Sequence, residues 1–172
     1  TVPWRVQNHI VWVKAIEFQG HIYGRSTVNI NAQYRLPNGH ETVWHFTHKG
    51  STSIDIEASS VPYRPEFAED NFQRTGRRTR PTTTCWHIPY ETTGYMGQAA
   101  KDLKGEKSHP AIYPRELVRH CLRVAGAQAG QTVYDPFAGT GTTLAVGQEF
   151  DLVSIGTEID PDYCAFIHQR LR

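Results

Sequence analysis

The sequence predicts an α/β fold built around a parallel sheet. The main observation lies near the C-terminus, where a strand over 132–135, a glycine turn over 136–141 and a helix over 142–148 are followed by a second strand and a second helix. This order is typical of a βαβ unit, whose two strands lie parallel. The second observation lies near the N-terminus. There the run Ile10–Val13 is rich in β-branched and aromatic residues, as expected of a strand covered on both faces.

The N-terminal and middle parts of the chain differ in character. A strand is predicted over Asn8–Phe18, followed by a turn at Pro37–Gly39 and by an alternating strand over Glu41–His48. The middle zone, roughly 50–108, has many prolines, glycines and threonines and little periodicity. We therefore expect an irregular insertion or small subdomain there.

The last zone gives the clearest pattern. Apolar side chains fall on one helical stripe over Pro114–Ala125, and the proline suits the first helical position. The second strand of the βαβ unit is predicted over Val153–Glu158. Asp160 and Pro161 then supply an N-cap and a first-turn proline for the closing helix.

Composition excludes several classes of protein. The 172 residues carry 18 Lys and Arg against 17 Asp and Glu, so any basic surface has to be local. The cysteines, Cys85, Cys121 and Cys164, lack CxxC spacing, which disfavours a disulfide framework or a zinc site. No apolar run approaches the length of a membrane span, and the N-terminus lacks the layout of a signal peptide. We therefore expect a cytoplasmic globular domain with no membrane segment and no metal.

The glycine turn is the main candidate binding site. Gly139 and Gly141 let the backbone approach a ligand, and the following helix adds unpaired N–H groups at its N-terminus. Glu158 ends the next strand, where a carboxylate can accept hydrogen bonds from ribose hydroxyls. Leu144 stands where a dinucleotide fingerprint has its third glycine, and no lysine follows the turn as in a P-loop. The pattern predicts a different adenosine-containing cofactor.

Several stretches resemble the permuted, beta-class-like DNA amino-methyltransferases, whose cofactor motif lies near the C-terminus. VYDPFAGTGTT (133–143) resembles their S-adenosylmethionine motif, and IGTEIDPDY (155–163) resembles the next one. HPAIYP (109–114) is similar to the HPxxxP segment that precedes the first strand. NHIVWVK (8–14) and WHIPYE (86–91) also look like family stretches.

The resemblance implies a three-layer, Rossmann-like fold of S-adenosylmethionine-dependent methyltransferases. It implies edge strands over 1–50, a target-recognition region over 51–108 and an S-adenosylmethionine-binding βαβ unit over 109–172. The expected activity is methylation of an exocyclic amine of adenine or cytosine in double-stranded DNA, commonly in restriction–modification. The cofactor-binding residues that it implies are His109, Pro110, Asp135, Pro136, Phe137, Ala138, Gly139, Thr140, Gly141, Thr142, Thr143, Glu158 and Ile159.

Individual roles follow from the same resemblance. Asp135 and the backbone of the turn would line the methionine and sulfonium end of the cofactor. Glu158 would take the ribose and Ile159 would pack on the adenine, while His109 and Pro110 would cap the pocket.

The family's catalytic loop, Asp/Ser/Asn-Pro-Pro-Tyr/Phe, is not found in this sequence, which has no Pro-Pro pair. In the family this loop binds the target amine, and its aromatic ring stacks on a flipped base. The loop and the central strands beside it precede the strand that corresponds to 8–18. We therefore expect an incomplete sheet and no catalytic residue within these positions. A fragment, a second polypeptide that supplies the catalytic half and a degenerate relative all stay open.

A cluster of arginines is the candidate DNA-binding surface. Arg74, Arg77, Arg78 and Arg80 fall within seven positions of an otherwise nearly neutral chain. The alternative is a solvated charged loop with no ligand. The family resemblance favours DNA binding over this alternative. Two other functions stay open: a non-catalytic DNA-binding or partner subunit, and, less favoured, a nucleotide-dependent oxidoreductase domain.

Overall fold

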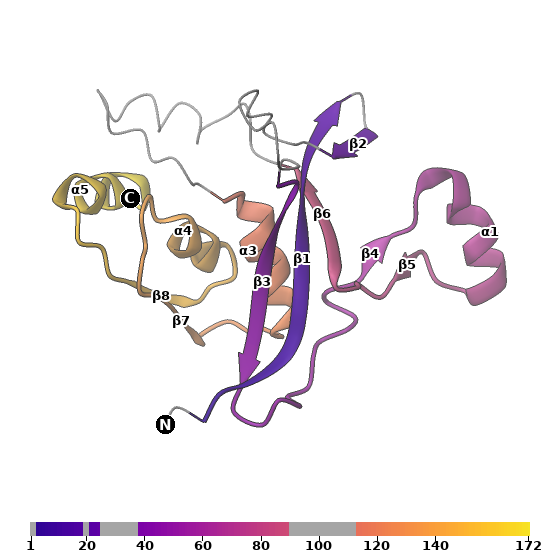
Figure 1. Cartoon of the computed structure of the whole chain (residues 1–172), viewed down its shortest axis with the longest axis horizontal. Coiled ribbons are helices and arrows are strands. Elements are labelled where there is room, and N and C mark those ends of the chain that lie inside the picture. The colour runs from indigo at the N-terminus through magenta and orange to yellow at the C-terminus, as the bar shows by residue number, and fades with distance from the viewer. Residues whose placement is uncertain (1–2, 19–20, 25–37, 90–112) are drawn as a thin grey trace.

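The computed structural model describes residues 3–18, 21–24, 38–89 and 113–172 (Figure 1). Within these ranges the strands form a four-stranded main sheet, a two-stranded parallel sheet and a short two-stranded hairpin. One helix, α3 (Arg115–Val124), lies between the main sheet and the C-terminal elements (Figure 1). The observed mixture of strands and helices is that of an α/β protein, as the sequence predicts.

The main sheet is organised around one long strand, β1 (Arg5–Phe18). This strand pairs antiparallel with β3 (His40–Thr47) and with β2 (His21–Gly24). It pairs parallel with β6 (Cys85–Pro89). Strand β6 lies inside the middle zone, where the composition predicts an irregular insertion or small subdomain, and the structure places this strand in the main sheet.

Helix α3 covers one face of the main sheet. The shared core is formed by aromatic and aliphatic side chains of β1, β6 and α3, namely Ile10, Trp12, Trp86, Ile88, Leu117 and Val124. On the opposite face Val11 and Val13 are only half-buried, and Trp44 is 52% exposed. Among the described residues no element packs on that second face, so the predicted cover on both faces of β1 is seen on one face only.

The C-terminal elements form the predicted βαβ unit, here residues 132–170. The parallel strands are β7 (Thr132–Asp135) and β8 (Val153–Gly156), and α4 (Thr142–Glu149) connects them. The unit closes with α5 (Pro161–Arg170), which Asp160 caps by accepting a hydrogen bond from Asp162 N at 2.8 Å. Strand β8 ends two residues before the predicted end, so Glu158 lies in the loop that follows it.

A second group of elements projects from the main sheet on the side away from α4 and α5 (Figure 1). It consists of the hairpin strands β4 (Val61–Pro62) and β5 (Thr79–Arg80) with α1 (Pro65–Thr75) between them. We call residues 61–80 the arginine arm. Helix α1 has no buried residue, and it ends at Gly76, whose N–H donates to the carbonyl of Phe72 at 2.8 Å.

Three further features concern only the described residues. None of their helices is both long and apolar enough to cross a membrane. In the same ranges, no three or more His, Cys, Asp or Glu side chains are grouped as metal ligands. Cys85, Cys121 and Cys164 are free thiols.

Candidate functional site

The glycine turn leaves β7 at Asp135 and enters α4 at Gly141. Gly141 has φ 76°, a left-handed conformation that a residue with a Cβ adopts at a cost. A Cβ at this position would also lie 3.0 Å from Cγ1 of Ile167 in α5. Glycine is therefore required here both by the turn and by the close approach of the closing helix.

The turn is tied to the loop that follows β8. The backbone N–H of Thr157 donates to the carbonyl of Asp135 at 2.9 Å, and Ala138 N donates back to Thr157 O at 2.9 Å. The Thr157 hydroxyl donates to the carbonyl of Pro136 at 2.7 Å. Because these bonds run in both directions, the two loops behave as one structural unit.

Glu158 holds the same two loops together through its carboxylate. One oxygen, Oε2, accepts a hydrogen bond from Gly139 N at 2.7 Å. The other, Oε1, accepts from Ile159 N at 2.8 Å and from Asp160 N at 2.9 Å. Three backbone N–H groups thus hold the Glu158 carboxylate at the junction of the loops. A ligand bound there could donate to it from a hydroxyl group or pair with it through a cationic group.

Asp135 is the second carboxylate of the site. Its Oδ1 accepts from Phe137 N at 3.0 Å, and its Oδ2 accepts from the hydroxyl of Tyr113 at 3.1 Å. The Tyr113 hydroxyl also lies 2.8 Å from Oγ1 of Thr143, in the first turn of α4. Burial raises the pKa of Tyr113 to about 12, and the negative charge of Asp135 reinforces this while the Thr143 hydrogen bond opposes it. Tyr113 is therefore a neutral hydrogen-bond donor at physiological pH.

The structure brings the predicted turn residues and Glu158–Ile159 together, but with different exposure. Phe137 is 86% exposed and Ile159 is 98% exposed, which leaves two apolar side chains open to a ligand. Pro136 is also exposed, whereas Gly139 and Thr143 are half-buried. The residues whose side chains or Cα atoms are buried, and so shape the turn from within, are Ala138, Thr140, Gly141 and Thr142. His109 and Pro110 lie outside the described residues.

Two contributors to this site were not predicted from the sequence. Tyr113 belongs to the HPAIYP segment that resembles HPxxxP, but no role was assigned to it, and its contact with Asp135 was not predicted. Arg170, near the end of α5, donates from Nη1 to the carbonyl of Thr140 at 2.6 Å. Neither contact has a sequence signal, because both partners come from distant parts of the chain.

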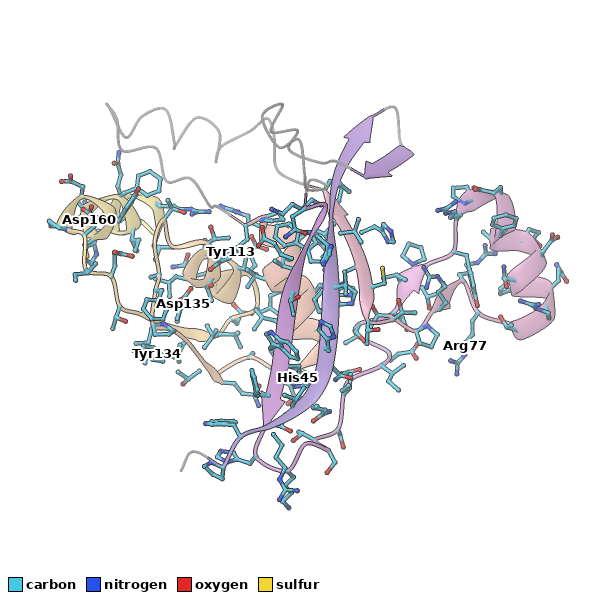
Figure 2. All side chains as sticks on the ribbon, viewed as in Figure 1. His45, Arg77, Tyr113, Tyr134, Asp135 and Asp160 are labelled. Carbon is cyan, nitrogen blue, oxygen red and sulfur yellow. The ribbon has the colours of Figure 1, made fainter. Side chains whose placement is uncertain are left out.

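The predicted DNA-binding arginines lie elsewhere. Figure 2 shows Arg77 on the arginine arm and Asp135 and Tyr113 on the other side of the main sheet. The structure therefore does not bring the arginine cluster to the glycine turn.

The four arginines also differ from one another. Arg74 donates from Nη2 to Oδ1 of Asn71 at 2.7 Å, and the Arg78 guanidinium lies 4.4 Å from the ring centre of Phe72. Arg77 and Arg80 are exposed, and within the described residues their guanidinium groups have no hydrogen-bond or ion-pair partner. Two of the arginines thus support the arm, and the other two are open to a partner.

Helix α3 contacts both the segment beside the arginine arm and the βαβ unit that carries the glycine turn. At its centre the buried His120 ring lies 2.8 Å, through Nε2, from the hydroxyl of Thr82, two residues beyond the arm, and burial lowers the pKa of His120. On its other side Arg119 Nε pairs with Glu149 of α4 at 2.6 Å, and Arg115 pairs with the same carboxylate at 3.1 Å. The hydrogen bond from Arg119 lowers the pKa of Glu149.

Comparison with known sequences places this geometry in a family. The chain matches the family model described as DNA methylase (N6_N4_Mtase) over residues 2–169. It is 41% identical over 168 residues to the type II methyltransferase M.SmaI of Serratia marcescens, covering 98% of this chain and 47% of that protein. It is 27% identical over 169 residues to M.Cfr9I of Citrobacter freundii, covering 98% and 45%. The chain thus spans about half the length of the curated relatives it matches.

Solved structures agree on the fold. The PvuII DNA methyltransferase (cytosine-N4-specific) matches with a TM-score of 0.70 at 20% identity, covering 98% of this chain and 52% of that one. The M1.HpyAVI–SAM complex matches with a TM-score of 0.55 at 19% identity, covering 98% and 62%. The predicted Rossmann-like methyltransferase fold with a partial sheet is confirmed by these matches, and the predicted family by the sequence comparison. The chain belongs to the DNA methylase family.

Proposed function

We propose that this chain forms the S-adenosylmethionine-binding and DNA-reading part of a site-specific DNA methyltransferase. The reaction would transfer the methyl group to an exocyclic amine of adenine or cytosine in double-stranded DNA. The names of the relatives, type II methyltransferases, support a role in restriction–modification. The observation that carries the proposal is the pair of ordered carboxylates, Asp135 and Glu158, that flank the glycine turn.

The chemistry of S-adenosylmethionine suits this site. The cofactor has a cationic ammonium and a sulfonium, a ribose with two hydroxyls, an adenine ring and no phosphate. Asp135 at the end of β7 would attract the cationic methionine end, and Glu158 would accept from the ribose hydroxyls. The exposed Phe137 and Ile159 side chains offer apolar surface to the adenine ring. The site therefore needs no P-loop lysine.

The arginine arm is the proposed DNA-reading element. It carries five arginines against three acidic residues, and the acidic side chains all lie in the first half of α1. Its positive charge is thus concentrated at the end of α1 and in β5. Long cationic side chains on a projecting helix can reach phosphates and guanine edges that a flat surface cannot.

We also propose that the catalytic loop comes from polypeptide outside these 172 positions, on the same chain or on a second one. Supporting observations are the length of the relatives and the open face of each sheet. On β7 and β8, Tyr134 is 57% exposed and Ile155 is 48% exposed. Apolar side chains on such a face are normally covered in an α/β protein.

Calorimetric titration with S-adenosylmethionine tests the proposal. We expect saturable binding by the wild-type protein, no binding by Asp135→Ala and an affinity at least about tenfold weaker for Glu158→Gln, because a charged acceptor is lost. Glu57→Gln is the matched control, since Glu57 is exposed and its carboxylate has no partner among the described residues. NAD serves as the control ligand.

Unchanged affinity in Asp135→Ala, or binding of NAD instead, would show that the site is assigned to the wrong cofactor. Digestion of DNA after incubation with the full-length protein and the cofactor then tests the reaction. N6-methyladenine or N4-methylcytosine in the digest identifies the target base. Cofactor binding and DNA binding without either product would instead identify a non-catalytic subunit.

A further inference from the structure

Tyr113 joins two parts of the molecule that are far apart in sequence. Its ring packs against the main-sheet core, which includes Trp12, Trp86 and Leu117. Its hydroxyl reaches the βαβ unit, 3.1 Å from Oδ2 of Asp135 and 2.8 Å from Oγ1 of Thr143. An apolar ring in one core and a polar tip on the neighbouring turn fix the side chain at both ends.

The direction of these two hydrogen bonds follows from proton counting. An ionised carboxylate has no proton to donate, so the single phenolic proton of Tyr113 is donated to Asp135. The Thr143 hydroxyl then has to donate to the phenolic oxygen. The result is a series of two hydrogen bonds: Thr143 in α4 donates to Tyr113, and Tyr113 donates to Asp135 at the end of β7. Each of these bonds polarises the other.

This pair of hydrogen bonds adds a donor from outside the glycine turn to the Asp135 carboxylate. The backbone N–H of Phe137 binds Oδ1, and the Tyr113 hydroxyl binds Oδ2, so the plane of the carboxylate is set by two unrelated donors. Without the hydroxyl, rotation about the Cα–Cβ and Cβ–Cγ bonds of Asp135 would be limited by one donor only.

We propose that Tyr113 is a positioning residue for cofactor binding: it orients the Asp135 carboxylate toward the methionine end of S-adenosylmethionine, and Thr143 acts through Tyr113. This inference rests on the proposed function and adds two roles to it. Thr143 supports the site through its hydrogen bond to Tyr113. Cofactor affinity then depends on Tyr113, whose ring packs against the core of the main sheet.

The test compares two ligands on the full-length protein. S-adenosylmethionine carries the methionine group, whereas 5′-methylthioadenosine has the same adenosine without the amino acid. We expect Tyr113→Phe to weaken S-adenosylmethionine binding about tenfold, as for loss of a hydrogen bond to a charged group, and to weaken methylthioadenosine binding less than about twofold. The phenylalanine ring keeps the core packing, so the variant should fold, and thermal unfolding measures what the lost hydrogen bonds contribute to stability.

Thr143→Val and the control Tyr63→Phe complete the design. Thr143→Val should show the same ligand pattern with a smaller loss, and adding it to Tyr113→Phe should cause little further loss, since one acts through the other. Tyr63→Phe removes a hydroxyl on the arginine arm that has no partner among the described residues, and it should bind both ligands as the wild type does.

Equal losses for the two ligands in Tyr113→Phe would mean a general structural role and overturn the inference, as would wild-type affinity for both. Either result leaves the proposed function standing if the wild-type protein binds S-adenosylmethionine. A wild-type protein that binds no S-adenosylmethionine would remove both the proposed function and this inference.

Discussion

In the βαβ unit, the loops that face the candidate cofactor are tied to one another by backbone and carboxylate hydrogen bonds, as at Glu158 and Thr157. In the arginine arm, α1 has no buried residue, and the Arg77 and Arg80 side chains extend without a partner among the described residues. A small ligand is bound well by groups that are already in place, because little entropy is lost on binding. A polyanion such as DNA is bound by long cationic side chains, which can adjust their conformation to the phosphates. The difference in burial between the two regions therefore fits the two ligands proposed for them, a small cofactor and a DNA duplex.

The largest effect is expected where the βαβ unit is packed most tightly. A Cβ on Gly147 of α4 would lie 2.9 Å from Cγ1 of Val133 and closer still to Oγ of Ser154. Gly147→Ala should therefore lower the free energy of unfolding by about 2 kcal/mol, as overpacked substitutions do. The gain in helix propensity, about 1 kcal/mol, is too small to offset the clash. Urea unfolding measures this difference.

Gly39→Ala is the matched control, because a Cβ at Gly39 would have no neighbour within 4 Å. It should leave the unfolding free energy nearly unchanged. Equal stability of the two variants would contradict the tight packing of α4 on β7 and β8, and with it the first half of the comparison.

A smaller effect is expected for DNA binding when single arginines of the arginine arm are replaced. Arg77→Ala and Arg80→Ala should each weaken binding to duplex DNA about threefold and lower the slope of log affinity against log salt by about 1, as for the loss of one phosphate contact. Fluorescence anisotropy with labelled DNA over a range of salt measures both quantities. Thermal stability should not change, because neither side chain has a partner in the described structure.

Arg74→Ala and Arg78→Ala provide the contrast within the same cluster. Their side chains bind Asn71 and Phe72, so these variants should loosen the arm and affect DNA binding mainly through that change. Four equal losses would mean that the arm acts only through its total charge. No loss in any variant would leave the cluster as a solvated surface.

The same contrast explains what the sequence could predict. The βαβ unit was predicted nearly element by element, because its glycine turn, its N-cap at Asp160 and its apolar stripes are local patterns. The contact of Tyr113 with Asp135 was not, because it depends on how α3 packs between two sheets. Nor was the exposure of Trp44, since a strand pattern does not say which faces are covered.

The arginine arm shows a second reason why a sequence pattern can fail to predict a structural element. Helix α1 does carry end signals, Pro65 at its start and Gly76 at its end, but no apolar stripe leads to a core. Periodicity detects a helix through the face that it buries, and α1 buries none. The pairing of β6 with β1 was missed for the usual reason that strand partners distant in sequence leave no local trace.

The smallest effect is expected at the ion pairs that join α3 to the βαβ unit. Glu149 of α4 lies 2.6 Å from Arg119 and 3.1 Å from Arg115, but its side chain is 32% exposed, so water and salt screen the attraction. Glu149→Gln should therefore lower the free energy of unfolding by only about 0.5 kcal/mol at neutral pH. Glu57→Gln serves as the control for loss of an isolated surface charge.

The pH dependence of that small difference separates an ion pair from simple packing. The hydrogen bond from Arg119 lowers the pKa of Glu149 below its ordinary value of 4.5, so the folded state favours the ionised form. Its contribution is fully present above pH 4.5 and is lost as the pH falls through the lowered pKa of the folded state. Wild type and Glu149→Gln should thus converge in stability as the pH falls below 4.5 and through that lowered pKa, and also in high salt. A difference that stays constant with pH would mean that the charge of Glu149 does not stabilise the contact between α3 and α4, and would contradict the role of the ion pairs in joining the two sheets.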